Sequence, residues 1–271
     1  MTRSAAPGRR SRRRYPGWVG LILVVLLLVN LAVNPWLARH RSLAVMSGYD
    51  WWHQRNSVAR DAGVHIDMPL RDGGLFPMLV TYNADEAMSA WLGEPVRFTV
   101  EFSFGDFDGG HSTIFEPDHR LYGAYVGAYH LQGLGHAPSA RQIGMVAEFD
   151  QRILALPALG LPSTAALFEI EQQSPASPVS FAGQEWTSHD AQVLTNCPDH
   201  SSAGFSPADL QFGRPPQTSA HYPLCRMTAR IDVAYLAEHD LGIGLFIMAT
   251  DADVVERLSS QVVRRAELVA G

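Results

Sequence analysis

The sequence predicts an α+β protein in which one transmembrane helix precedes one exported domain, with helices packed on a largely antiparallel sheet. Three observations support this fold class. Residues 18–37 form an uncharged, mostly apolar run; later segments alternate apolar and polar residues in hairpin-like succession; and helical patterns stand between groups of strands. The 271 residues, 46% of them hydrophobic, leave room for one large core or two small ones.

Residues 18–37 have the length and composition of a membrane anchor. As a helix they would span roughly 30 Å, the thickness of the hydrocarbon core of a bilayer. Six arginines precede the run and two follow it. The positive-inside rule therefore places residues 1–17, a basic tail, in the cytoplasm and the rest of the chain outside. We expect a single-pass protein of the cell membrane that contacts the lipid bilayer through residues 18–37.

Two other export signals compete with the anchor. The strictly apolar part, residues 18–29, is as short as the core of a cleaved signal peptide, and Ser42 and Ala44 supply small residues at a candidate cleavage site. The apolar character resumes after Asn30, however, which favours an uncleaved anchor. Residues 11–15 resemble a twin-arginine signal, but the residues that follow do not fit one. All three interpretations export the body of the protein.

The charge balance excludes several classes of function. Residues 1–41 hold eight arginines and no acidic residue, so the 13 remaining arginines face all 27 acidic residues and the rest of the chain carries a net charge of −14. This negative net charge argues against nucleic acid as a partner of the rest of the chain, because the phosphates are negative as well. The chain contains no lysine, so it can have neither a lysine that forms a Schiff base nor the lysine that a P-loop requires. We expect no cofactor.

Residues 38–77 read as a connecting region and residues 78–271 as the folded extracytoplasmic domain. A helix is expected from Asn83, which forms a capping box with Glu86, to a glycine at position 93. Directly afterwards residues 96–104 alternate without error. Their apolar positions should face a core, and the polar positions between them should face water or another polar surface.

The later elements complete the α+β pattern. A helix should begin at Ser139, which caps it together with Gln142, and should stop at Pro157. A Ser/Pro-rich break at residues 174–178 is a candidate subdomain boundary, although one folding unit is favoured. Extended segments are expected at 121–131, 167–171, 228–236 and 241–249, with a last helix beginning at Thr250.

Tyr125 and Tyr129 share one face of the segment 121–131. They could line a ligand groove, or their rings could fill the space above the glycines between them, and the second interpretation is favoured.

Cys197 and Cys225 are the two cysteines of the chain, and both fall in the exported part. An oxidising compartment favours a disulfide between them, which on the chain-entropy model would remove about 3.6 kcal/mol of unfolded-state entropy. Two unpaired thiols are the alternative.

The stretch G-D-F-D-G-G-H, residues 105–111, is the main candidate for a metal site. Asp106, Asp108, His111 and the nearby His119 offer oxygen and nitrogen ligands, and D-x-D motifs also hold the metal in glycosyltransferases. An EF-hand would need glycine where His111 stands. The favoured interpretation is a hairpin turn that joins strand 96–104 to a segment beginning at Ser112.

Histidine spacing gives no local metal site. The chain has 11 histidines, but no two stand two, three or four residues apart, so no strand or helix supplies a chelating pair by itself. A serine nucleophile elbow is also missing.

The leading hypothesis is therefore a membrane-anchored accessory or ligand- or protein-binding protein of the cell envelope without catalytic activity, with another envelope protein as a candidate partner. The alternative is an extracytoplasmic metal-assisted hydrolase or transferase that uses the Asp/His cluster. A sensor is less favoured, because a tail of 17 residues leaves no room for a cytoplasmic domain.

Overall fold

The computed structural model describes residues 17–33, 48–64, 80–103, 107–108, 111–112, 117–158, 161–197 and 222–265. The chain falls into two compact units, Met1–Arg41 and Ser42–Gly271.

The first unit contains helix α1, Gly17–Val33, with 17 residues. Its described leucine side chains are exposed, for example Leu21 at 64%. At 1.5 Å per residue the helix is about 26 Å long. Among the residues that the structure describes, no helix is both long enough and apolar enough to cross a membrane. Residues 34–37 of the predicted span lie outside the described residues, so the anchor remains a prediction.

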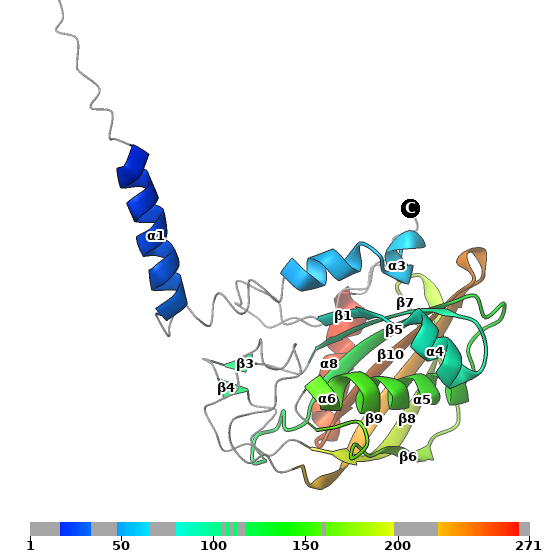
Figure 1. Cartoon of the computed structure of the whole chain (residues 1–271). Helices are drawn as coiled ribbons and strands as arrows, with labels where there is room; N and C mark the ends of the chain where they lie inside the picture. Colours follow the sequence, from blue (N-terminus) through cyan, green and yellow to red (C-terminus); the bar gives the residue numbers. More distant parts are fainter. Residues whose placement is uncertain are drawn as a thin grey trace, which may run out of the picture. The chain divides into compact units, whose positions relative to one another are not determined.

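The second unit is built on an antiparallel sheet whose described part has eight strands (Figure 1). The order is β1-β2-β5-β10-β9-β8-β6, and β7 pairs with β8. The strands are β1 Val80–Asn83, β2 Arg97–Ser103, β5 Tyr125–Gln132, β6 Phe168–Gln173, β7 Ser177–Phe181, β8 Gln184–Asn196, β9 Leu224–Leu236 and β10 Leu241–Ala249. The predicted α+β class with a largely antiparallel sheet is confirmed.

Helices cover both faces of this sheet (Figure 1). One face, called here the α5 face, carries α4 (Asp85–Leu92), α5 (Ala140–Phe149), the π-helical turn η2 (Asp150–Ala155) and α6 (Leu156–Ala158). The opposite face, the α8 face, carries α3 (Val58–Asp61) and α8 (Ala252–Arg265). The short 3-10 helix η3 (Ala237–His239) joins β9 to β10.

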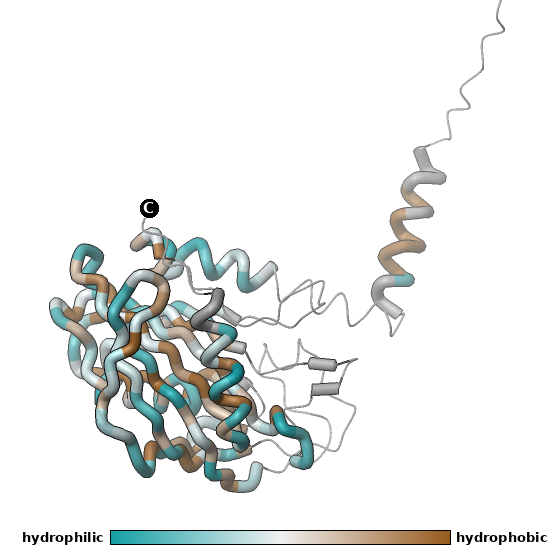
Figure 2. The backbone as a smooth tube through the Cα atoms, turned by 180° about the vertical axis from the view of Figure 1, so that it is seen from behind, coloured by the Kyte–Doolittle hydropathy of each residue, from teal (hydrophilic) through white to brown (hydrophobic). Residues whose placement is uncertain are grey.

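The central strands are apolar because both of their sides are covered. All nine residues of β10 are buried. Such a strand reads as a continuous apolar run in the sequence. Figure 2 shows hydrophobic stretches within the sheet and more hydrophilic stretches around it. The α5 face and the α8 face each carry a separate apolar cluster.

Strand β2 differs from its prediction on one side. Phe98, Val100 and Phe102 are buried on the α5 face as expected. Thr99 and Glu101, which should face water or a polar surface, are also buried. Residues 48–64 cover them, and these residues belong to the predicted connecting region. We call residues 48–64 the docking segment.

Predicted helix boundaries at both ends of α4 and at the start of α5 fall in the described residues. At α4 the predicted capping box is wrong, because Asn83 is the last residue of β1 and Ala84 is the N-cap. Gly93 closes the helix as predicted, with a φ of 76°. At α5 the predicted capping box between Ser139 and Gln142 is confirmed.

Candidate functional site

The predicted Asp/His residues are only partly described. Asp106 and the side chains of Asp108 and His111 lie outside the described residues. The short strands β3 (Phe107–Asp108) and β4 (His111–Ser112) pair in a small separate sheet, in which Asp108 lies opposite His111. The predicted hairpin between β2 and the segment at Ser112 is wrong, since β2 pairs with β1 and β5. Both edges of β2 are already paired, one with β1 and the other with β5.

His119 makes a local contact in which its Nδ1 accepts a hydrogen bond from the backbone N–H of Leu121 at 3.1 Å. In the part of the chain that the structure describes, no three His, Cys, Asp or Glu side chains come close enough to hold a metal ion. A metal site that includes Asp106, Asp108 and His111 therefore stays a prediction.

Cys197 and Cys225 lie side by side at the end of the β8–β9 pair, and the structure places no disulfide between them. A hydrogen bond with Cys225, together with burial, raises the pKa of the Cys197 thiol. The Tyr122 hydroxyl lies 3.9 Å from the Cys225 sulfur. The disulfide also stays a prediction, and the fold already brings its two partners together.

A polar cluster is buried on the α8 face beneath the docking segment. Its members, which we call the α8-face cluster, are Asp50, Thr81, Thr99, Glu101 and His130. They come from the docking segment and from β1, β2 and β5. The sheet register places Thr81 opposite Glu101, and Thr99 opposite His130. Directly opposite residues share a face, so the strands gather the cluster at one place.

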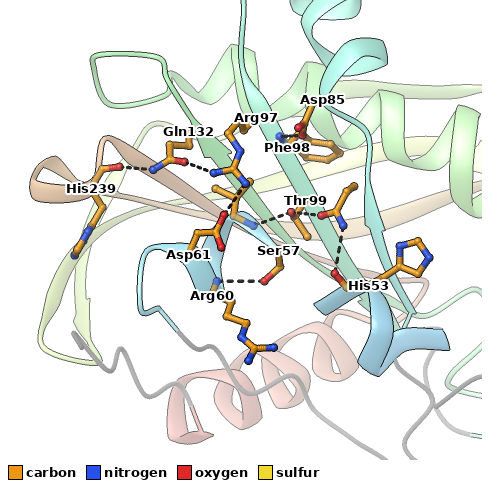
Figure 3. Close-up of polar contacts among 12 residues, drawn as sticks. His53, Ser57, Arg60, Asp61, Asp85, Arg97, Phe98, Thr99, Gln132 and His239 are labelled. Carbon is orange, nitrogen blue, oxygen red and sulfur yellow. Dashed lines mark hydrogen bonds and ion pairs between the residues drawn. The ribbon is translucent and has the colours of Figure 1, made fainter. Parts of the chain in front are cut away.

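Hydrogen bonds attach the docking segment to this cluster. Thr81 of β1 donates a short hydrogen bond to Oδ1 of Asp50. Within the segment, Gln54 Nε2 donates to Oδ2 of the same carboxyl group at 2.9 Å. Further along the segment, the Val58 N–H donates to Thr99 Oγ1 at 3.0 Å. Figure 3 shows this second attachment, in which the Thr99 hydroxyl in turn donates to Asn83 at 2.6 Å.

The two acids of the cluster are shifted toward neutral pKa values. Burial raises the pKa of Asp50 to about 6, although the hydrogen bond from Thr81 opposes this shift. Burial and the nearby charge of Asp50 raise the pKa of Glu101 to about 7. Both carboxyl groups can therefore take up and release protons near neutral pH.

A second polar cluster, which we call the α5-face cluster, consists of Tyr125, Tyr129 and Asp150. Asp150 Oδ2 accepts a short hydrogen bond from Tyr125 and a second one from Tyr129 at 3.0 Å. All three side chains are fully buried. Asp150 begins the π-helical turn η2, and such turns often occur at functional positions. A Cβ at Gly127 would lie 3.0 Å from Tyr125 Cε1, so glycine leaves room for the ring.

Burial is also the main cause of the shifted pKa values in this cluster. It raises the pKa of Asp150 to about 7, while the two tyrosine hydrogen bonds oppose the shift. Burial and the neighbouring carboxyl group raise the pKa values of both tyrosines, which stay protonated donors. Because the tyrosines are enclosed rather than lining a groove, the favoured interpretation of their sequence pattern agrees with the structure.

The surface carries a groove of about 570 Å³ between α5 and the edge strand β6. Its lining residues are Ala140, Arg141, Gly144, Met145, Glu148, Arg152 and residues 167–173. None of the acids with raised pKa values lines it. We call this feature the α5–β6 groove.

Sequence reasoning missed both buried clusters. Glu101 sits at a polar position of an alternating strand, which indicates exposure, and Asp150 lies within a helical pattern. The partners of these residues are far away in sequence, so no local spacing marks them. Comparison with known proteins does not add a function, because no family model matches the chain and no curated protein matches it.

Proposed function

We propose that the protein is a membrane-anchored, extracytoplasmic accessory domain of the cell envelope that binds another protein and does not catalyse a reaction. One observation carries this proposal. The described carboxyl groups best suited to proton chemistry are buried in the α5-face and α8-face clusters, whereas the α5–β6 groove contains none of them. A groove whose described lining lacks such groups suits binding better than catalysis.

The groove has features that suit a protein ligand. Strand β6 is the last strand on its side of the sheet, so an extended segment could pair along it. The walls bear charge as well: Arg141 and Glu169 are exposed and form no ion pair with any described residue. Both signs of charge would help to orient an incoming segment.

The anchor is proposed on the sequence and on local structure together. Residues 18–37 carry no charge, and 16 of these 20 residues fall within α1. An arginine-rich stretch stands before the run and the acidic body after it. This arrangement would hold the second unit outside the cytoplasmic membrane, with residues 1–17 in the cytoplasm.

Two measurements test the proposal. Protease added to spheroplasts should digest a C-terminal tag and spare an N-terminal one. A photo-crosslinking residue at Glu169 should yield a defined crosslinked protein in intact cells, whereas the same residue at Glu185, exposed on β8, should not. Correct topology without any product specific to position 169 would contradict binding at the groove, and the reverse tag pattern would contradict the anchor.

The hydrolase or transferase alternative keeps one supporting observation, the pairing of Asp108 with His111 across β3 and β4. This register places a carboxylate and an imidazole residue opposite each other. Stoichiometric zinc, calcium or manganese in the purified protein, lost together with Asp106 and Asp108, would favour the alternative.

A further inference from the structure

Two buried carboxyl groups meet where the docking segment reaches the sheet. Asp50 belongs to helical residues 48–54 of the segment, and Glu101 belongs to β2. Thr81 lies opposite Glu101 and donates its hydroxyl to Asp50, so the two acids flank one threonine. Asp50 is 6% exposed and Glu101 is 9% exposed. The Glu101 carboxyl group forms no hydrogen bond with any residue that the structure describes.

No described cation compensates the pair. The titratable or charged side chains on the elements packed around it are Tyr49, His53, Arg55, Arg60 and Asp61 of the docking segment, Tyr82 of β1, Arg97 of β2 and His130 of β5. Among these, Arg97 is paired with Asp61 at 2.7 Å, and Arg55 is stacked on the ring of Trp51 at 3.7 Å. Helix α8, on the same face, packs on β9 and β10.

The docking segment is held at two ends by different kinds of contact. Residues 57–64 are fixed by the Val58–Thr99 hydrogen bond and the Asp61–Arg97 ion pair (Figure 3). Buried apolar side chains of the same residues also hold them. None of these contacts involves Asp50 or Glu101. Residues 48–54 are held by the carboxyl group of Asp50, which accepts a hydrogen bond from Thr81. They are held also by the hydrogen bond that Asn83 Nδ2 donates to the backbone oxygen of His53 at 3.3 Å, and by the contact between the Tyr49 and Tyr82 rings. The segment can therefore open at one end and stay closed at the other.

We propose that Asp50 and Glu101 form a proton-operated latch, which holds residues 48–54 on β1 and β2 when the pair is protonated and releases them when both acids ionise. The raised pKa values, about 6 for Asp50 and about 7 for Glu101, place the transition near neutral pH. Two adjacent negative charges in a buried site repel each other and lose their hydration. Moving residues 48–54 into water relieves both effects.

A released segment would lengthen the link between the sheet and the predicted anchor. Seven residues span about 10 Å as a helix and about 24 Å when extended. The released form would thus give the exported domain a longer tether at high pH than at low pH. This consequence rests on the proposed membrane anchoring, whereas the latch itself does not.

Hydrogen exchange of the full chain in detergent micelles tests the latch. Exchange rates of residues 48–54 and 58–64 are measured at pH 5.5 and 8.0 and corrected for intrinsic exchange. Each acid disfavours the docked state tenfold for each pH unit between its ordinary pKa and its raised pKa in the docked state, and the effect levels off above the raised value. Residues 48–54 should therefore exchange at least about tenfold faster at pH 8.0 than at pH 5.5. Residues 58–64 should change less than about twofold.

Neutral variants identify the titrating groups. Glu101→Gln and Asp50→Asn should each reduce the pH response and together abolish it, while Glu185→Gln should leave it intact. Equal protection of wild-type residues 48–54 at both pH values would overturn the latch, as would a response that survives in the double variant. If the double variant does not fold, the single variant Glu101→Gln provides the test. The pH midpoint of its exchange response should differ from that of wild type, and an unchanged midpoint contradicts the proposal.

Titration of a nearby histidine is the main competing explanation for a pH response of residues 48–54. His53→Gln and His130→Gln should both keep the pH response of residues 48–54, and its loss in either variant would assign the titration to imidazole instead. The result is independent of the anchor. A failed protease-protection test removes the membrane role and leaves the latch standing, whereas flat hydrogen exchange removes the latch alone.

Discussion

Replacing Asp150 with asparagine should flatten the dependence of stability on pH. The pKa of Asp150 is raised from 3.8 to about 7 in the folded protein, mainly by burial. Between these values the folded state holds a proton that the unfolded state has released, so stability falls as pH rises from about 4 to about 7. The full difference corresponds to about 4 kcal/mol, and this loss persists above pH 7. Asparagine does not ionise and removes that loss.

The variant should keep most of the local contacts. The amide oxygen of asparagine can accept the hydroxyls of Tyr125 and Tyr129 in place of Oδ2. The amide nitrogen would then take the place of Oδ1, which has no hydrogen-bond partner among the described residues. An unpaired buried donor costs about 1–3 kcal/mol. We therefore expect Asp150→Asn to be less stable than wild type at pH 4.5 and more stable at pH 8.

Urea unfolding of the full chain in detergent, followed by tryptophan fluorescence at several pH values from 4.5 to 8, measures this crossing. Glu185→Gln is the matched control, because it removes one exposed acid from β8. A free-energy difference between Asp150→Asn and wild type that is the same at pH 4.5 and pH 8 would mean that Asp150 titrates normally. The burial argument for the α5-face cluster would then be wrong.

Three further changes probe separate parts of the fold. Gly127→Ala should lower stability by about 1–3 kcal/mol, because the new methyl group would press on the Tyr125 ring, and urea midpoints equal to wild type would contradict this packing. Ser139→Ala should cost about 0.5–2 kcal/mol through the lost cap of α5, whereas Ser139→Asp should restore most of it in the same assay. In exported protein, non-reducing mass spectrometry should find Cys197 linked to Cys225. Formation of this disulfide passes two electrons to an external disulfide or quinone oxidant. Two alkylatable thiols in the exported protein would refute the link.

Local patterns in the sequence predicted much of the secondary structure. The capping box at Ser139, the C-terminal glycine of α4 and the apolar run of β10 all depend on residues close together in the chain. Such signals act within one turn of helix or along one strand, so they can be read without knowing the fold. The α+β class followed from their order along the chain.

Only the tertiary structure decided what surrounds the polar residues of those elements. The alternation of β2 predicted which side faces a core, yet Glu101 is buried because a segment some 40 residues earlier folds over the other side. Asp150 meets Tyr125 and Tyr129 across 25 and 21 residues, through a π-helical turn that no pattern marks. Burial and the charge of a distant neighbour shift a pKa, and both arise only when the chain has closed. The sequence by itself thus determined the elements, whereas the fold decided which of their acids hold protons near neutral pH.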